Sequence, residues 1–144
     1  MAIMSELDEV HVIYFVLCDQ VITEANSSKQ SLIGIYSSMI VEQLPASANL
    51  AVAVGLRVQS ARQRELSFRF TGPQGEMVFS SPPLPYSADP VEMGLHAAGF
   101  ASLQIGLNLR SMPFNSPGIY TAAFYCDGVL IATYPLSVMV GAPR

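Results

Sequence analysis

Along much of this chain, large apolar side chains alternate with small or polar ones. This period-two pattern is typical of a β-strand with one buried face. The alternation is clearest in residues 50–59, and it recurs in residues 66–71 and 100–110. In the first of these segments the large side chains share one face: Leu50, Val52, Val54, Leu56 and Val58. We therefore expect half-buried strands in all three segments.

Two earlier segments are apolar without a clean alternation. Residues 10–22 are dense in β-branched and aromatic side chains, which lose rotamer freedom in helices, so a strand is favoured over an amphipathic helix. Because this run is apolar on both faces, it lies either at the centre of a sheet whose outer face is covered or at a subunit interface. Residues 32–41 predict a second strand, with Gly34 marking a bulge or a close approach.

The strongest turn signal is Asp127-Gly128, which lies between two runs rich in Val, Ile, Tyr, Phe and Thr. Both residue types tolerate the positive φ of a two-residue hairpin. Pro117-Gly118 precedes the first run, and Tyr120 near its start is a candidate for the tyrosine corner of immunoglobulin-like sandwiches. The segment thus predicts a C-terminal hairpin anchored by a tyrosine hydroxyl.

The register of that hairpin is not regular. With a strict two-residue loop, the apolar positions of the second strand cannot all face the same side as Tyr120 and Phe124. We therefore expect an irregularity between Cys126 and Pro135, with Pro135 at an edge or a bulge. A second hairpin is predicted from residues 66 to 79, around the turn Gly72-Pro73-Gln74-Gly75.

Residues 81–90 hold four of the ten prolines and predict a loop or a polyproline segment. Pro82-Pro83-Leu84-Pro85 matches the form of a polyproline ligand, but a structural crossing loop is favoured because no basic residue flanks it. Asp89-Pro90 then starts a short helix, with Asp as the cap and Pro at the first position.

Together these elements predict an all-β fold: an antiparallel, immunoglobulin-like β-sandwich of about eight strands, with one short helix near residues 89–98. A barrel is the second choice. The whole chain, residues 1–144, is expected to form a single domain.

Composition adds a prediction about assembly. Only 12% of the residues are charged and 51% are hydrophobic, so some of the surface is expected to be covered by a partner. A homodimer is the plainest form of such an assembly, and an unknown protein partner is the other. The net charge of −4 argues against nucleic acid and anionic membranes as partners. The first residues lack a basic start and an apolar run, so we expect a soluble, cytoplasmic protein.

Catalytic and metal-binding patterns are weak. No serine stands in a nucleophile elbow, and the two His and two Cys are not paired at ligand spacing. Cys18 and Cys126 are expected to be reduced and packed. An enzyme that uses Cys126 or His96 is the third hypothesis; we expect no enzyme and no cofactor.

The arginines are unevenly distributed. Arg57, Arg62, Arg64 and Arg69 are four of the seven basic residues and surround one predicted turn. They could converge into a patch for an anion or a partner, since guanidinium groups suit carboxylates and phosphates. A solvated turn paired with Glu65 is the favoured alternative.

Several segments resemble a family of small uncharacterised bacterial proteins, an immunoglobulin-like domain of unknown function. The segments that carry the resemblance are 18–21, 31–36, 117–120, 127–128 and 134–138, together with the connection at Pro45. The resemblance covers nearly the whole chain, and its motifs are strand edges and turns. It implies a β-sandwich in a bacterial cytoplasm and brings no known activity or binding residue.

The leading hypothesis is therefore a non-enzymatic interaction module that forms a homodimer. The alternative is a sandwich that binds a small ligand, either a carbohydrate or an anion. That ligand would contact Tyr86, Tyr134 or the arginine group.

Overall fold

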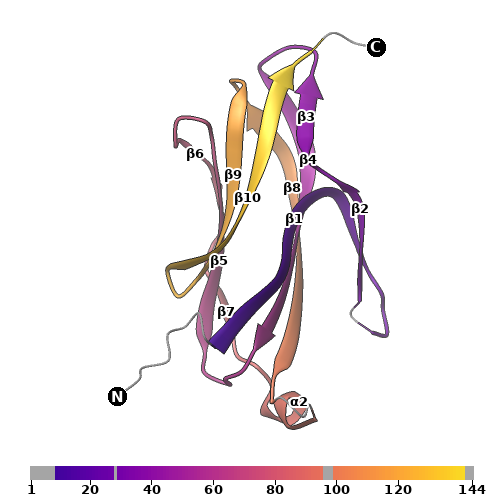
Figure 1. Cartoon of the computed structure of the whole chain (residues 1–144), viewed down its shortest axis with the longest axis vertical. Coiled ribbons are helices and arrows are strands. Elements are labelled where there is room, and N and C mark those ends of the chain that lie inside the picture. Colours follow the sequence, from indigo (N-terminus) through magenta and orange to yellow (C-terminus); the bar gives the residue numbers. More distant parts are fainter. Residues whose placement is uncertain (1–8, 28, 96–98, 142–144) are drawn as a thin grey trace.

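The computed structural model describes residues 9–27, 29–95 and 99–141, which form ten strands and one short helix in two sheets (Figure 1). The elements are β1 (Val10–Thr23), β2 (Gln30–Ile35), β3 (Ser38–Val41), β4 (Ala46–Val58), β5 (Arg64–Thr71), β6 (Met77–Ser80), β7 (Leu84–Tyr86), α2 (Pro90–Leu95), β8 (Ala101–Phe114), β9 (Gly118–Cys126) and β10 (Val129–Val140). The first sheet has the order β2-β1-β4-β8 and the second the order β3-β10-β9-β5-β6, with β7 also paired to β5. The predicted β-sandwich with one short helix is confirmed.

The number of strands exceeds the expected eight for two reasons. The predicted strand at residues 32–41 is two strands, β2 and β3, which belong to different sheets. The proline-rich segment, expected to be a loop, contributes the short strand β7, whose Leu84 pairs with Leu66. All pairings are antiparallel except the parallel pairing of β3 with β10.

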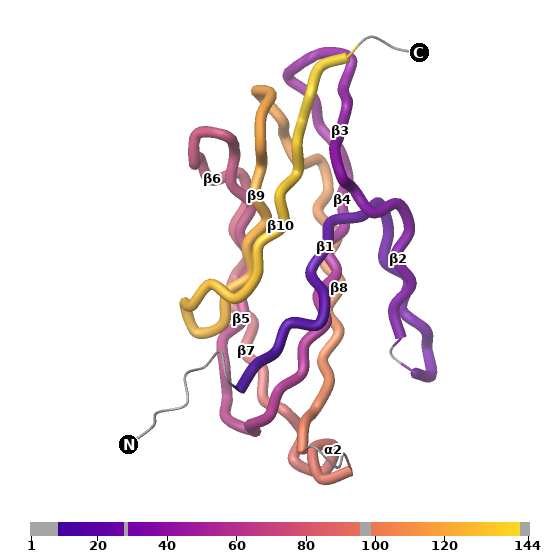
Figure 2. The backbone as a smooth tube through the Cα atoms, viewed as in Figure 1, coloured from indigo at the N-terminus to yellow at the C-terminus, as the bar shows by residue number. Residues whose placement is uncertain are grey.

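The chain crosses from the first sheet to the second between β2 and β3, and the backbone tube in Figure 2 traces this crossover. Gly34 has φ +69°, and a Cβ there would lie 2.3 Å from Oδ2 of Asp19. The predicted close approach at this glycine is therefore confirmed. Two residues later, the amide of Tyr36 donates to the carbonyl of Leu17 (2.9 Å), and its hydroxyl donates to Asp19 (2.5 Å). These contacts fix the crossover against β1.

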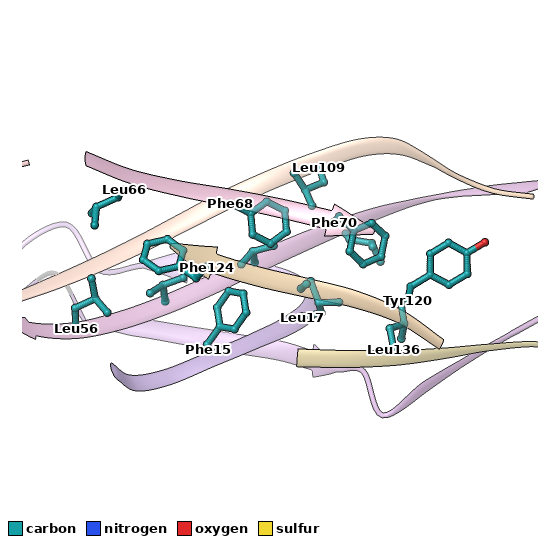
Figure 3. Packing of buried hydrophobic residues seen from close by; sticks show 14 of the residues in the cluster. Phe15, Leu17, Leu56, Leu66, Phe68, Phe70, Leu109, Tyr120, Phe124 and Leu136 are labelled. Atoms are coloured by element: carbon teal, nitrogen blue, oxygen red, sulfur yellow. The ribbon is translucent and has the colours of Figure 1, made fainter. Parts of the chain in front are cut away.

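The core lies between the sheets and is filled by the alternating residues that the sequence identified (Figure 3). Leu50, Val52, Val54, Leu56 and Val58 of β4 are all at most 2% exposed. They face a group of aromatic side chains from the second sheet and from β1: Phe15, Phe68, Phe70, Tyr120 and Phe124. The burial of these apolar side chains is the main stabilising contribution to the sandwich.

The outer face of β4 is also buried, contrary to the expected half-buried strand. Ala51 and Ala53 are 0% exposed, because the β1–β2 hairpin folds back over this side of the first sheet (Figure 1). A Cβ on Gly55 would lie 2.3 Å from the ring of Tyr14, and a Cβ on Gly106 would lie 3.2 Å from Val21. Small residues on β4 and β8 thus make room for the hairpin, while Ile13 and Ile22 of β1 stay 52% and 44% exposed.

The C-terminal hairpin has the predicted turn and anchor. Asp127 and Gly128 have φ +50° and +80°, and Val129 pairs with Cys126 across the two-residue loop. The register shifts between Leu130 and Ala132, which is the expected irregularity. The hydroxyl of Tyr120 donates to the carbonyl of Ser116 (2.8 Å), so the tyrosine corner is confirmed. Figure 3 shows this hydroxyl directed away from the core side chains.

Strands β4 and β8 both continue beyond the segments expected from the sequence, past a bulge where the amide of Ser111 donates to Oδ1 of Asn49 (2.8 Å). Residues 46–48 and 112–114, expected to be loops, therefore pair with each other. The helix start is as predicted, since Oδ1 of Asp89 accepts from the amide of Val91 (2.9 Å).

Candidate functional surfaces

The four arginines of the predicted patch have different surroundings. Arg57 on β4 lies over the ring of Phe100, with 4.8 Å from its Cζ to the ring centroid. Arg69 on β5 lies over Tyr125, at 4.5 Å. Both are cation–π contacts within the chain. Whether these side chains also bind an anion or a partner stays a prediction.

Arg62 and Arg64 are instead brought together by carboxylates. Nη1 of Arg62 lies 3.2 Å from Oδ2 of Asp127, and Nη2 of Arg64 lies 2.6 Å from Oε2 of Glu9. The same Glu9 oxygen lies 3.9 Å from Nε of Arg62. Asp127 also accepts from the amide of Glu65 (2.7 Å). The cluster therefore ties the start of β1, the start of β5 and the C-terminal hairpin together.

Arg64 differs from the other three because its side chain is fully buried. Glu9 takes one guanidinium nitrogen, while Nε and Nη1 have no hydrogen-bond partner in the described part of the chain. A buried charge with one partner is costly to separate from that partner. The Arg64–Glu9 pair is thus a structural link, and Arg64 lies on the same face of β5 as the buried Leu66 two residues later.

The cysteines are packed, as expected. Cys18 and Cys126 are both 0% exposed. Burial raises the pKa of the Cys18 thiol, which disfavours the reactive thiolate. His11 is exposed, whereas His96 lies outside the described residues. Within residues 9–27, 29–95 and 99–141, no group of three or more His, Cys, Asp or Glu side chains could hold a metal ion.

The tyrosines considered as ligand contacts have structural partners. Tyr134 donates its hydroxyl to the carbonyl of Tyr36, which links β10 to the crossover between the sheets. Tyr86 on β7 is half-buried and packs against the core, and burial is the main cause that raises the pKa of its phenol. Neither residue lines a described hollow.

A shallow hollow of about 340 Å³ lies on the first sheet near the start of β1. Its lining is His11, Ile13, Arg57, Gln59 and Phe100. His11 and Arg57 are paired across β1 and β4, so an imidazole and a guanidinium border the same space. One arginine of the predicted patch therefore lies in a concave, partly polar site.

Three adjacent strands of the second sheet carry no charged residue on their outer face. On β3, β10 and β9, the residues that alternate with the buried core positions point outward, and none of them is charged. They are Ser38, Ile40, Ile119, Thr121, Ala123, Tyr125, Thr133, Pro135, Ser137 and Met139. We call these residues the charge-free face.

The largest apolar side chains of the charge-free face gather at one end of it. Ile40 is 64% exposed, Ile119 53% and Met139 44%. Met139 is the register partner of Ile40 on β3, and Ile119 pairs with Ser137, two residues before Met139. The uncharged alternate positions of residues 118–126 and 129–140 were visible in the sequence, but β3 joins them only through the parallel pairing.

A second apolar region lies where the two sheets face each other beside β8. A pocket of about 270 Å³ is bordered by Phe68 and Phe124 from the second sheet, by Ile105 and Leu107 from β8, and by the segment 81–84. The amide of Phe68 donates to Oγ of Ser81 (2.8 Å), which holds this segment at the pocket. The P-x-x-P match thus forms one wall of a pocket as part of the crossing between β6 and β7.

No helix in the described part of the chain is long and apolar enough to cross a membrane. A model of a family of unknown function (DUF6941) matches residues 13–139. Among curated proteins, no sequence matches.

Solved structures show likeness at low sequence identity. An immunoglobulin-like protein from Pseudomonas aeruginosa has 12% identity and a TM-score of 0.46, with 90% of this chain and 96% of that one covered. The alkylpurine DNA glycosylase AlkC of Pseudomonas fluorescens, bound to DNA with an abasic site analogue, has 8% identity and a TM-score of 0.49 over 91% of this chain. A β-glucosidase from Listeria innocua has 9% identity and a TM-score of 0.47 over 90% of this chain. The chain spans 30% of the glycosylase chain and 16% of the glucosidase chain.

Proposed function

The chain belongs to this family of unknown function, and we propose that it acts as a non-enzymatic interaction module that forms a homodimer through the charge-free face. The observation that carries the proposal is the absence of charge from ten outward positions on three adjacent strands, β3, β10 and β9. Interface centres are depleted in charged residues and enriched in Met and Tyr. The exposed Ile119, Ile40 and Met139 supply apolar area at one end of this face.

A second copy is the favoured occupant because the face is self-complementary in charge. The chain carries a net charge of −4, so any surface that brings two copies together must avoid like charges. Packing the charge-free face on its own copy across a two-fold axis meets this condition, since an isologous contact uses the same patch on both subunits. Arg69, on the neighbouring strand β5, is held over Tyr125 at the margin of this face.

The test is the substitution Ile119→Lys, followed by sedimentation at micromolar concentration. We expect the wild type to sediment as a dimer and the variant as a monomer, because the new ammonium group would be desolvated at the interface. The matched control is Ile33→Lys, at an isoleucine on β2 that is 48% exposed, against 53% for Ile119. The control should remain dimeric, and both variants should keep the wild-type melting temperature to within a few degrees.

Two results would contradict the proposal. If the wild-type protein stays monomeric at these concentrations, the homodimer hypothesis is wrong. A dimer that Ile33→Lys dissociates and Ile119→Lys does not would move the interface to the β1–β2 hairpin.

Small-ligand binding is the second candidate, supported by the hollow that contains His11 and Arg57. Two nitrogen donors beside the Phe100 ring suit a small anion. Titration with inorganic phosphate, followed by NMR, should then shift the resonances of Arg57 in the wild type. Unchanged spectra at millimolar phosphate would remove this candidate.

A further inference from the structure

Strand β8 leaves one of its edges unpaired. It is the last strand of the first sheet and pairs with β4 from Ala101 to Phe114. The amide of Ser102 donates to Oε1 of Glu92 in α2 (3.0 Å), so this amide points away from β4. Backbone groups alternate in direction along a strand. The amides and carbonyls of Gln104, Gly106 and Asn108 therefore also point to the free edge.

No hydrogen bond from the described residues reaches these three amides and carbonyls at that edge. Unpaired edge groups on a long strand with few charges are a template for another strand. The sequence alone could not show this, because residues 100–110 would read the same in a central strand.

The side chains between these three residues point into the sandwich yet are incompletely covered. Leu103, Ile105 and Leu107 pair with the core positions Leu56, Val54 and Val52, but each is only half-buried. The first sheet ends at β8, so no further strand of this sheet covers these side chains in the described part of the chain. The pocket of about 270 Å³ beside Ile105 and Leu107 is this unfilled part of the core.

The geometry selects an extended peptide as the occupant. Groups at every second residue of an edge are satisfied by the backbone of a strand, while alternate side chains of that strand enter the pocket. The opposite wall includes Pro82 and Pro83, which have no amide hydrogen, so β8 supplies the backbone bonds. The pocket volume lies just below the range of about 300 to 1,000 Å³ typical of drug-sized ligands, which favours side chains over a free small molecule.

Charge at the two ends of this edge defines the peptide further. Residues 103–109 are uncharged, the Glu92 carboxylate lies at one end beside Ser102, and the exposed Arg110 follows at the other. We propose that β8 binds an extended peptide from a partner protein as an additional antiparallel strand. This peptide is uncharged with alternating apolar residues in its middle, acidic at its amino end and basic at its carboxyl end. The site is separate from the charge-free face and does not depend on the homodimer.

The test uses a synthetic nine-residue peptide with capped ends, Asp first, Lys last, and valine alternating with threonine between them. Binding to the full-length protein is measured by fluorescence anisotropy of a labelled copy. The edge variant is Asn108→Pro, because proline replaces an amide that faces the free edge and leaves the bonds to β4 in place. The matched control is Asn108→Ala.

We expect the wild type and Asn108→Ala to bind alike, and Asn108→Pro to bind at least about tenfold more weakly. A peptide in which Asp and Lys exchange places should also bind more weakly. A second variant, Ile105→Phe, fills the pocket without altering the backbone and should weaken binding, and circular dichroism checks that each variant is folded.

Three outcomes would overturn the proposal. One is no binding of the peptide to the wild type at millimolar concentration. Another is equal affinity of the wild type, Asn108→Pro and Ile105→Phe. The third is a wild-type protein that binds no peptide but forms a dimer that Asn108→Pro dissociates. That result would show that the β8 edge pairs with a second copy of this chain. Failure of the Ile119→Lys test leaves these measurements unaffected.

Discussion

Among single residues, Tyr120 combines a ring that packs in the core with a hydroxyl that binds the backbone of a loop. Its ring is 1% exposed and lies 5.0 Å, centroid to centroid, from the ring of Phe114. Its hydroxyl reaches out of the core to the backbone of Ser116, four residues earlier. The tyrosine corner therefore joins the loop before β9 to the packed core.

The substitution Tyr120→Phe keeps the ring and removes the bond to the Ser116 carbonyl. We expect the free energy of unfolding to fall by about 1 to 2 kcal/mol, since a partly buried acceptor loses its donor. Urea unfolding with an unchanged m-value is the measurement. Tyr125→Phe, at a half-exposed tyrosine on the outer face, is the control and should change stability by less than about 0.5 kcal/mol. Equal effects of the two substitutions would mean that the corner contributes nothing.

At the level of the secondary-structure elements, the β1–β2 hairpin belongs to the first sheet and also folds over the outer face of β4 and β8. It rests on small residues of β4 and β8, and the ring of Tyr14 occupies the space where a Cβ of Gly55 would stand. Tyr14 also donates its hydroxyl to Gln30, so the hairpin is tied across its own two strands. The glycine is thus required by packing rather than by its backbone conformation.

Replacing Gly55 by Ala should displace the Tyr14 ring and loosen the hairpin. We expect a loss of about 1 to 3 kcal/mol, as for other overpacked sites, and faster hydrogen exchange of the amides in β2. Gly94→Ala is the matched control, because a Cβ there meets nothing within 4 Å and α2 gains helix propensity. Unchanged exchange in β2 of Gly55→Ala would show that the hairpin does not depend on this contact.

At the scale of the whole molecule, the two sheets are joined where the chain crosses between them. Tyr36 stands at this crossover, with its hydroxyl on Asp19 of β1 and its carbonyl bound by Tyr134 of β10. Burial, followed by the hydrogen bond and the charge of Asp19, raises the pKa of Tyr36 from 10.0 to about 12. The folded protein therefore favours the neutral phenol.

This shift predicts a loss of stability in alkali. The contribution of Tyr36 is fully present below pH 10, the pKa of the free phenol, and is lost as the pH rises through about 12. The measurement is the free energy of unfolding of the wild type and of Tyr36→Phe across this range. We expect the difference between them to shrink as the pH rises, since the other tyrosines titrate in both proteins. A difference that is constant with pH would contradict the assignment.

The local features of this protein follow from its amino-acid sequence. The strand and core face at residues 50–59, the Asp127-Gly128 turn, the Asp89 cap and the tyrosine corner depend on neighbours in the chain, and each was predicted correctly. The burial of the two cysteines was likewise predicted from the apolar residues around them in the sequence. These features are visible because local backbone preferences and side-chain periodicity fix them before any distant contact forms.

The choice of which strands pair with each other depends instead on long-range contacts in the folded chain. The split of residues 32–41 between two sheets, the pairing of Arg64 with Glu9 and the free edge of β8 depend on partners far away in the chain. A strand has the same period of two in any position of a sheet, so its sequence does not say whether it lies at an edge or which face another layer covers. For this reason the charge-free face and the β8 edge, the two surfaces proposed to bind partners, became visible only in the assembled sandwich.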